Sequence, residues 1–171
     1  MSQPGANASL PHEVARFLEE HTTLALATVG PSHTPAVAPL FYAVLPEGDI
    51  VFLSERDTEH AYNLEWSPGV ALSIYKDAQP WQRIRGMQAK GHAERLSPSR
   101  WPAAWRAYSS RFPFVAETQN ADALTGQLVG ALAKARWYVV RLMWIRLIDN
   151  TRGFGWKAEW QRTPKGWERI R

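Results

Sequence analysis

Three polar side chains occur together where the sequence predicts the start of a helix. Residues 57–66 have helical periodicity, and Arg56, Thr58 and His60 lie at the beginning of that segment. The free N–H groups and the positive dipole end of a helix N-terminus attract anions, and a hydroxyl, an imidazole and a guanidinium add donors and charge. The pattern indicates a phosphate-binding site. The alternative is that Thr58 only caps the helix and His60 lies on the surface.

A second pair of polar side chains lies on a long predicted strand, residues 84–95. Gln88 and Lys90 alternate with small apolar residues, so both point to one face and both could reach the edge of one ligand. An exposed polar face without a ligand explains the same alternation. The apolar run Pro39-Leu40-Phe41 could line a slot for a flat ring, or Phe41 could be a core residue.

Several classes of chemistry are excluded. The chain has no cysteine, so thiolate nucleophiles, iron–sulfur ligation and cysteine zinc sites are absent, and any redox chemistry needs a bound cofactor. His12-Glu13 lacks the second histidine of a zincin motif, and His92 with Glu94 has no third ligand at a useful spacing, so no metal site is expected. No nucleophile elbow, Walker loop or dinucleotide fingerprint is present, and the catalytic residues stay unassigned.

The composition is that of one soluble domain. The 171 residues are 45% hydrophobic and 21% charged, without an apolar run long enough for a membrane helix or a signal peptide, which predicts a cytoplasmic protein with no membrane contact. The net charge of +4 is spread among acids, so nucleic-acid binding ranks lowest among the functions considered. Nine Trp indicate an aromatic core or an interface, and five of them lie in the last quarter.

The elements expected to position these side chains are mostly antiparallel strands. Residues 1–10 are expected to form a flexible arm and residues 11–171 a single domain. Tyr138, Val140, Leu142 and Trp144 are expected to share one face of the last long strand. Helices are predicted at 11–20, 57–66, 97–112 and 123–133, and strands at 24–29, 36–45, 50–54, 70–75, 84–95, 136–148 and from 156. This order favours a mainly β fold with added helices: a small antiparallel barrel of about six strands.

An ordered set of short motifs resembles the pyridoxamine 5'-phosphate oxidase superfamily, and in particular a little-characterised bacterial branch of it. The resemblance covers residues 18–156. Its motifs are LATV (26–29), PAVAPLF (35–41), DIVFLS (49–54), DTEHAYNL (57–64), SPGVAL (67–72), RGMQAKG (85–91), AYSSRFP (107–113) and DNTRGFG (149–155).

The resemblance implies a six-stranded split β-barrel that forms a homodimer, with FMN held between the two subunits. By position, Thr58 and His60 fall where the superfamily binds the FMN phosphate. Residues that would line the flavin are Pro39, Leu40, Phe41, Leu53 and Ser54, and Asn150 is a further contact unless it only forms a turn.

The implied function is an FMN-dependent oxidoreductase that acts on an unknown small molecule. The alternative is a flavin- or haem-binding module without turnover, for storage, sensing or transfer. The family oxidases carry an arginine and a lysine where this chain has Ala38 and Ala43, and a glutamine near what is here Gly86. Pyridoxamine phosphate is therefore expected to be a poor substrate, because its phosphate would lack these cations.

Overall fold

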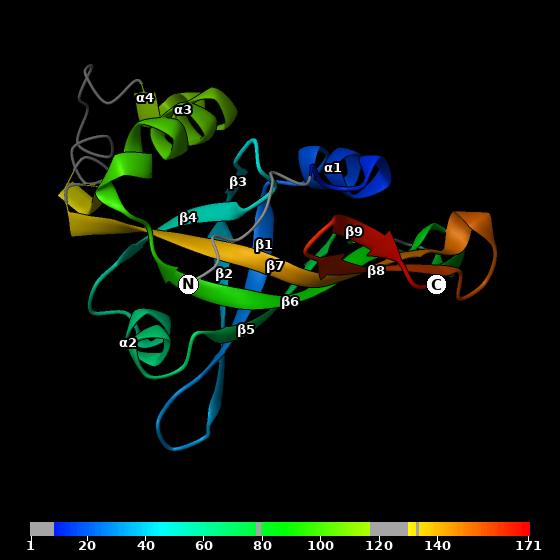
Figure 1. The fold of residues 1–171 in the computed structure, drawn as a ribbon, viewed down its shortest axis with the longest axis horizontal. Coiled ribbons are helices and arrows are strands. Elements are labelled where there is room, and N and C mark those ends of the chain that lie inside the picture. Colours follow the sequence, from blue (N-terminus) through cyan, green and yellow to red (C-terminus); the bar gives the residue numbers. More distant parts are fainter. Residues whose placement is uncertain (1–8, 78–79, 117–129, 133) are drawn as a thin grey trace.

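The computed structural model describes residues 9–77, 80–116, 130–132 and 134–171, and its centre is one antiparallel sheet that curls into a half-barrel (Figure 1). The strand order is β2-β1-β5-β6-β7-β4-β3, and β8 and β9 extend the sheet from β7. The strands are β1 (Thr23–Val29), β2 (Pro35–Phe41), β3 (Ala43–Val44), β4 (Ile50–Glu55), β5 (Gly69–Tyr75), β6 (Arg85–Arg95), β7 (Ala135–Asp149), β8 (Lys157–Thr163) and β9 (Gly166–Arg169). The mainly antiparallel barrel predicted from the sequence is confirmed.

The strand β7 joins the two parts of the sheet. Along one edge it pairs first with β4, through residues 135–140, and then with β8, through residues 144–148. Along its other edge it pairs with β6 over almost its whole length. At the far side of the sheet β2 comes back against β4, which curls the sheet toward closure.

The helices around the sheet are α1 (His12–Glu19), α2 (Glu59–Trp66), α3 (Trp101–Arg111) and α4 (Pro113–Ala116), and residues 130–132 are also helical. The helix predicted at 123–133 lies for most of its length outside the described residues. The short helix α1 buries Val14, Phe17 and Leu18 in the barrel core, and Leu10, at the end of the expected arm, also packs there. Three 3-10 turns complete the chain, at Trp81–Arg83, Pro98–Arg100 and Asn150–Arg152.

Two hydrophobic clusters hold these elements together. The larger one fills the barrel and includes Leu26, Phe52, Tyr138 and Ile145. The smaller cluster lies between α3 and the outer side of β3, β4 and the first half of β7. Its members are Ala43, Leu45, Val51, Leu96, Ala104, Tyr108, Phe112, Val115 and Val139. The helix α3 therefore covers only one part of the outer face of the sheet.

Two details of the strands differ from the prediction. The strand expected over 36–45 is interrupted at Tyr42, whose side chain is fully buried and whose hydroxyl donates a hydrogen bond to the Leu18 carbonyl at 2.8 Å. The prediction that Trp144 shares one face of β7 with Tyr138, Val140 and Leu142 is also wrong. The register with β6 shifts between Lys90 and Gly91. After this bulge Trp144 lies opposite the exposed Lys90, away from the core face that holds Leu142.

The bulge depends on a glycine. A Cβ atom added to Gly91 would lie 2.3 Å from the carbonyl oxygen of Arg141, which is backbone and cannot move aside easily. Gly86 lies on the same strand, and there an added Cβ would meet its nearest neighbour at 3.6 Å, an ordinary contact.

We expect Gly91→Ala to lower the free energy of unfolding by about 1–3 kcal/mol, because the extra carbon forces the strands apart. Gly86→Ala is the matched control and should change this free energy by less than about 1 kcal/mol. Urea denaturation of the two variants checks the prediction, and equal stability of both would contradict the close approach at the bulge.

Candidate functional site

Ser54, Thr58 and His60 form a compact hydrogen-bonded cluster at one end of the barrel. Ser54 Oγ lies 2.6 Å from His60 Nε2 and 3.1 Å from Thr58 Oγ1, and Thr58 Oγ1 lies 3.2 Å from His60 Nε2. Ser54 and His60 are buried, with exposed fractions of 8% and 9%. The structure thus brings together three of the residues predicted to bind the cofactor.

The local chain path explains this grouping. Ser54 is near the end of β4, and a tight turn leads directly into α2, so Thr58 and His60 return beside it. Thr58 is the N-cap of α2: its hydroxyl accepts a hydrogen bond from the Ala61 N–H and donates one to the Glu55 carbonyl. The capping role considered as an alternative is confirmed for Thr58, whereas His60 is not a surface residue.

The environment of His60 favours its neutral form. Burial lowers the pKa of His60 below its usual value, and the nearby carboxylate of Glu59 opposes this shift only in part. The ring of Phe52 packs edge-on against the imidazole, with centroids 6.4 Å apart. Without a bound anion, the imidazole is therefore neutral around pH 7.

Three arginines lie around this cluster, and two of them were not identified from the sequence. Arg136 is the cross-strand neighbour of Ser54, and Arg95 is that of Tyr138. Burial raises the pKa of the Tyr138 hydroxyl and the carboxylate of Glu65 adds to this shift, while Arg95, Arg136 and Arg56 act on the same pKa in the opposite direction. In the part of the chain that the structure describes, none of the three forms an ion pair with a carboxylate. Three guanidinium groups therefore lie near Tyr138, whose ring stacks on Phe52 beside His60.

Three of the other predicted cofactor residues, Pro39, Gln88 and Lys90, lie on the uncovered outer face of the sheet. The strand registers align two rows across it, Val37-Ala27-Ala71-Lys90-Trp144 and Pro39-Ala25-Ser73-Gln88-Arg146. Small side chains occupy the middle strands, so the rows enclose a shallow hollow of about 440 Å³. A hollow with a flat floor of alanines can accept a flat ring or the surface of another protein chain.

One wall of this hollow combines an aromatic ring with two cations. Lys90 Nζ lies 5.3 Å from the ring centroid of Trp144, and the guanidinium of Arg146 lies 4.9 Å from it. Arg146 also donates hydrogen bonds to Gln88 and Glu159, at 3.3 and 3.0 Å. Gln88 and Lys90 therefore share one face as predicted, and the bulge adds Trp144 and Arg146 to that face.

The remaining predicted residues are dispersed. Phe41 is on the outer face, where its ring packs against Phe112 and Phe114, whereas Leu40 points inward and packs on the barrel core. Leu53 packs against the smaller cluster under α3. Asn150 is part of a turn, since its side chain donates to the Trp81 carbonyl and accepts from the Gly155 N–H.

Within one chain, the cluster and the outer-face hollow are far apart. Their neighbours on β7, Arg136 and Arg146, are ten residues apart, which is roughly 33 Å along an extended strand. A flavin that contacts both groups must therefore take them from two chains. Sequence reasoning missed Arg95, Arg136, Tyr138, Trp144 and Arg146, and only the strand register brings them to these places.

The cluster fits anion binding better than nucleophilic catalysis. A serine within 2.6 Å of an imidazole resembles a nucleophile with its base, but a third group must orient that base. Nothing hydrogen-bonds His60 Nδ1 among the described residues. The same residues contain no group of three or more His, Asp or Glu side chains arranged to hold a metal, and no helix long and apolar enough to cross a membrane.

Comparisons with known proteins identify the family. The family model described as pyridoxamine 5'-phosphate oxidase matches residues 10–141. A UPF0306 protein from Citrobacter koseri is 33% identical over 112 residues, which are 66% of this chain and 66% of that protein, so the match spans about two thirds of its length.

Two solved structures share the fold. A pyridoxamine 5'-phosphate oxidase-related, FMN-binding protein from Nostoc punctiforme is 16% identical, with a TM-score of 0.65 over 97% of this chain and 100% of that one. A haem-binding protein from Mycobacterium smegmatis is 19% identical, with a TM-score of 0.66 over 94% of this chain and 60% of that one. The family match, over most of the described barrel, shows that this chain belongs to the pyridoxamine 5'-phosphate oxidase family.

Proposed function

We propose that the protein binds FMN as a homodimer and is an FMN-dependent oxidoreductase that acts on a small molecule. The observation that carries this proposal is the cluster of Ser54, Thr58 and His60 at the start of α2, with Arg56, Arg95 and Arg136 around it. Hydroxyl and imidazole donors in a field of unpaired arginines match the needs of a phosphate group.

The phosphate of FMN would replace the internal hydrogen bonds of the cluster. Ser54 and Thr58 can turn their hydroxyl hydrogens toward an anion, and His60 can donate from its ring once it is protonated. The first N–H groups of α2 point in the same direction as the Thr58 side chain that caps them. Glu59 lies in this first turn and opposes anion binding, so the surrounding arginines are needed to make the local potential positive.

The uncovered face of the sheet supports the homodimer. Its middle strands carry only small side chains at Ala25, Ala27, Ala71 and Ser73, while Val37 at its edge is 68% exposed. A second copy packed on this face would bury Val37 and bring Gln88 and Lys90 to a site shared between chains. The relative from Nostoc punctiforme, which has the same fold over its whole length, is an FMN-binding protein, which supports FMN as the cofactor.

In such a site the chain's own residues bind and orient, and the flavin supplies the capacity to accept or donate a hydride. The phosphate cluster fixes one end of the cofactor. Lys90 and Gln88 offer a positive charge and an amide that can donate to, and adjust the electron density of, the polar edge of a ring. None of these residues needs to act as a nucleophile.

The second candidate is a haem-binding module without turnover, favoured by the likeness to the haem-binding protein from Mycobacterium smegmatis. Haem needs an axial ligand, and the buried His60 is engaged with Ser54 and Thr58 through Nε2. The visible spectrum of the freshly purified protein, with mass spectrometry of the group released by heat, decides between flavin and haem. Oxidation of NAD(P)H or of another donor by flavin-loaded protein separates an enzyme from a carrier.

We expect His60→Ala to weaken FMN binding about tenfold to a hundredfold, because one hydrogen bond to a charged phosphate is lost. Thr58→Val should have a similar effect on FMN and should also destabilise α2 by about 1 kcal/mol through loss of the cap. Riboflavin lacks the phosphate, so its affinity should barely change. Fluorescence titration with both flavins measures the difference.

Two controls belong to this experiment. Thr58→Ser keeps both the cap and the hydroxyl and should bind FMN as the wild type does. His12→Ala removes an exposed imidazole at the start of α1 and should change neither affinity. Equal weakening of FMN and riboflavin in the His60 variant would place the phosphate elsewhere.

The pH dependence of FMN binding should report His60. Burial lowers the pKa of His60 in the cofactor-free protein, and a phosphate dianion beside it raises that pKa, so binding takes up a proton between these two values. The ratio of FMN affinity to riboflavin affinity should therefore fall as the pH rises through this window and level off above it.

His60→Gln separates the imidazole from other groups, since glutamine keeps a polar atom near Nε2 and does not titrate. The phosphate itself titrates near pH 6, and this contribution remains in the variant. We expect a flatter pH profile for His60→Gln than for the wild type. Identical profiles would mean that the imidazole does not titrate in contact with the phosphate.

Ala71→Glu should disrupt the homodimer. Ala71 is in the middle of the uncovered face, and a buried unpaired carboxylate there costs about 2–5 kcal/mol, which raises the dimer dissociation constant by at least about thirtyfold. FMN affinity should fall with it. Tyr62→Glu, on the exposed side of α2, is the control. Light scattering at micromolar concentration measures the mass, and a wild-type monomer with bound FMN would refute the dimer.

A further inference from the structure

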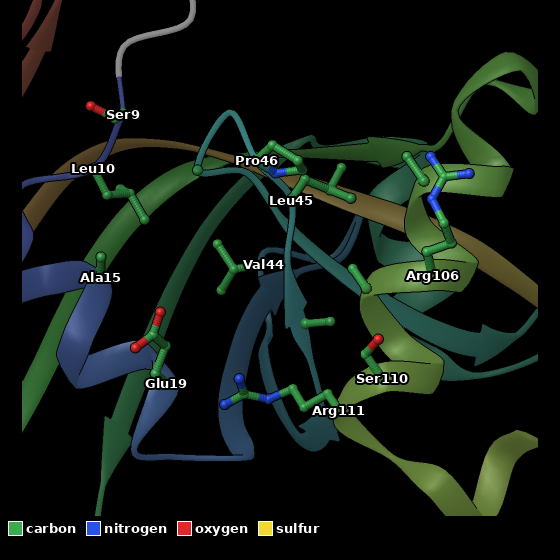
Figure 2. A pocket seen from close by; sticks show the side chains of 14 residues that line it. Ser9, Leu10, Ala15, Glu19, Val44, Leu45, Pro46, Arg106, Ser110 and Arg111 are labelled. Carbon is green, nitrogen blue, oxygen red and sulfur yellow. The ribbon is translucent and has the colours of Figure 1, made fainter.

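A second cavity lies on a different part of the molecule, between α1, the turn after β3 and α3 (Figure 2). Its volume is about 670 Å³, which is in the range of small-molecule sites. None of the residues that line it belongs to the predicted cofactor-binding set or to the outer-face hollow. The cavity therefore needs an explanation separate from FMN.

Most of the wall is apolar. Leu10 and Ala15 contribute from the N-terminal side, and Val44 contributes from β3. On the opposite side, α3 presents one helical stripe to the cavity, with residues at spacings of three, four, seven and eight: Ala103, Arg106, Ala107, Ser110 and Arg111. The alanines leave space beside the helix, and the polar residues of the stripe surround that space.

Arg111 has a buried N–H group without an acceptor. Its Nη2 donates to the carbonyl oxygens of Leu18 and His21, at the end of α1, and its guanidinium lies 5.0 Å from the centroid of the Tyr42 ring. Its Nε is buried and has no hydrogen-bond partner among the described residues. Arg111 therefore links α3 to the end of α1 and closes this side of the cavity.

Arg106 provides an available positive charge at the same wall. Its side chain is exposed and forms no ion pair within the described chain, whereas Arg100, in the 3-10 turn before α3, is neutralised by Glu47 and Asp49. Figure 2 shows the carboxylate of Glu19 on the opposite wall, away from Arg106. The charges thus favour an anion at the α3 wall and repel one from the α1 wall.

We propose that this cavity binds a small amphiphilic carboxylate, such as a medium-chain fatty acid. The carboxylate lies against Arg106, and the apolar body lies over Val44, Leu10 and the alanines of α3. An uncharged apolar molecule would not use the charge of Arg106, and an amine would place its own positive charge beside it.

Octanoate is a suitable probe, with 1-octanol and octylamine as compounds of the same apolar length. Titration into the full-length ¹⁵N-labelled protein should produce saturable shifts of the backbone amides of Val44, Ala107 and Arg111. Arg106→Ala should weaken octanoate binding by about tenfold or more, because a charge-assisted contact is lost. Ala107→Leu should weaken it by filling the cavity without a change of charge.

Lys165→Ala is the matched control, since it removes one exposed positive charge from the turn between β8 and β9, and it should leave octanoate binding unchanged. All three variants should keep the wild-type affinity for FMN. The proposal is overturned by shifts that do not saturate or lie elsewhere, by equal binding of octanoate and octanol, or by tighter binding of octylamine. Unchanged octanoate affinity in both Arg106→Ala and Ala107→Leu would overturn it as well.

Discussion

The pairing of β7 with three strands at once is the constraint on which the rest of the molecule depends. Its first half holds β4 and its second half holds β8, while β6 follows the other edge. A strand this long can pair with both β4 and β8 only if its twist changes along its length. The bulge opposite Gly91 provides this change. The bulge also exchanges the two faces. Before it the inward side chains include Val140 and Leu142, and after it they are Ile145 and Leu147.

This exchange of faces decides where the functional side chains point. Without the extra residue, Trp144 and Arg146 would point into the barrel, where a charged group would have no partner. With it they join Gln88 and Lys90 on the outer face. Arg136, which precedes the bulge, stays on the inner side beside Ser54. One strand therefore supplies a neighbour of the cluster, Arg136, and two residues of the outer-face hollow, Trp144 and Arg146, on opposite faces of the sheet.

The structural features that depend on local periodicity could be predicted from the sequence. The start of α2 with Thr58 and His60, and the alternation of Gln88 with Lys90, follow from spacings within a few residues, and the structure reproduces them. The features that were missed depend on the register between distant strands. No local pattern indicates that Arg95 and Arg136 lie beside Tyr138, that a bulge turns Trp144 outward, or that a buried tyrosine divides the strand expected over 36–45. Each motif is short, so the resemblance to the family rests on the order of the motifs along the chain and less on any single motif.

The arginines are arranged in the fold in a way that the composition of the chain does not indicate. In the sequence the positive charges are mixed with acids, which indicates an ordinary solvated surface. In the fold they separate into two groups. Arg85, Arg100 and Arg162 form ion pairs that connect elements of the barrel to one another. A second group of eight forms no ion pair within the described chain: Arg56, Arg83, Arg95, Arg106, Arg111, Arg136, Arg141 and Arg169.

Four of these eight arginines lie near the two proposed binding sites. Arg56, Arg95 and Arg136 act on the Tyr138 hydroxyl beside the hydroxyl–imidazole cluster, and Arg106 borders the cavity beside α3. A surface guanidinium usually gains little from a carboxylate partner, so the lack of one costs the fold little stability. The absence of a carboxylate partner leaves the positive charge of the guanidinium available, which raises the local concentration of anions and strengthens their binding. The proposed binding of FMN and of a carboxylate therefore depends on these four guanidinium groups, whose charge no carboxylate of the described chain neutralises through an ion pair.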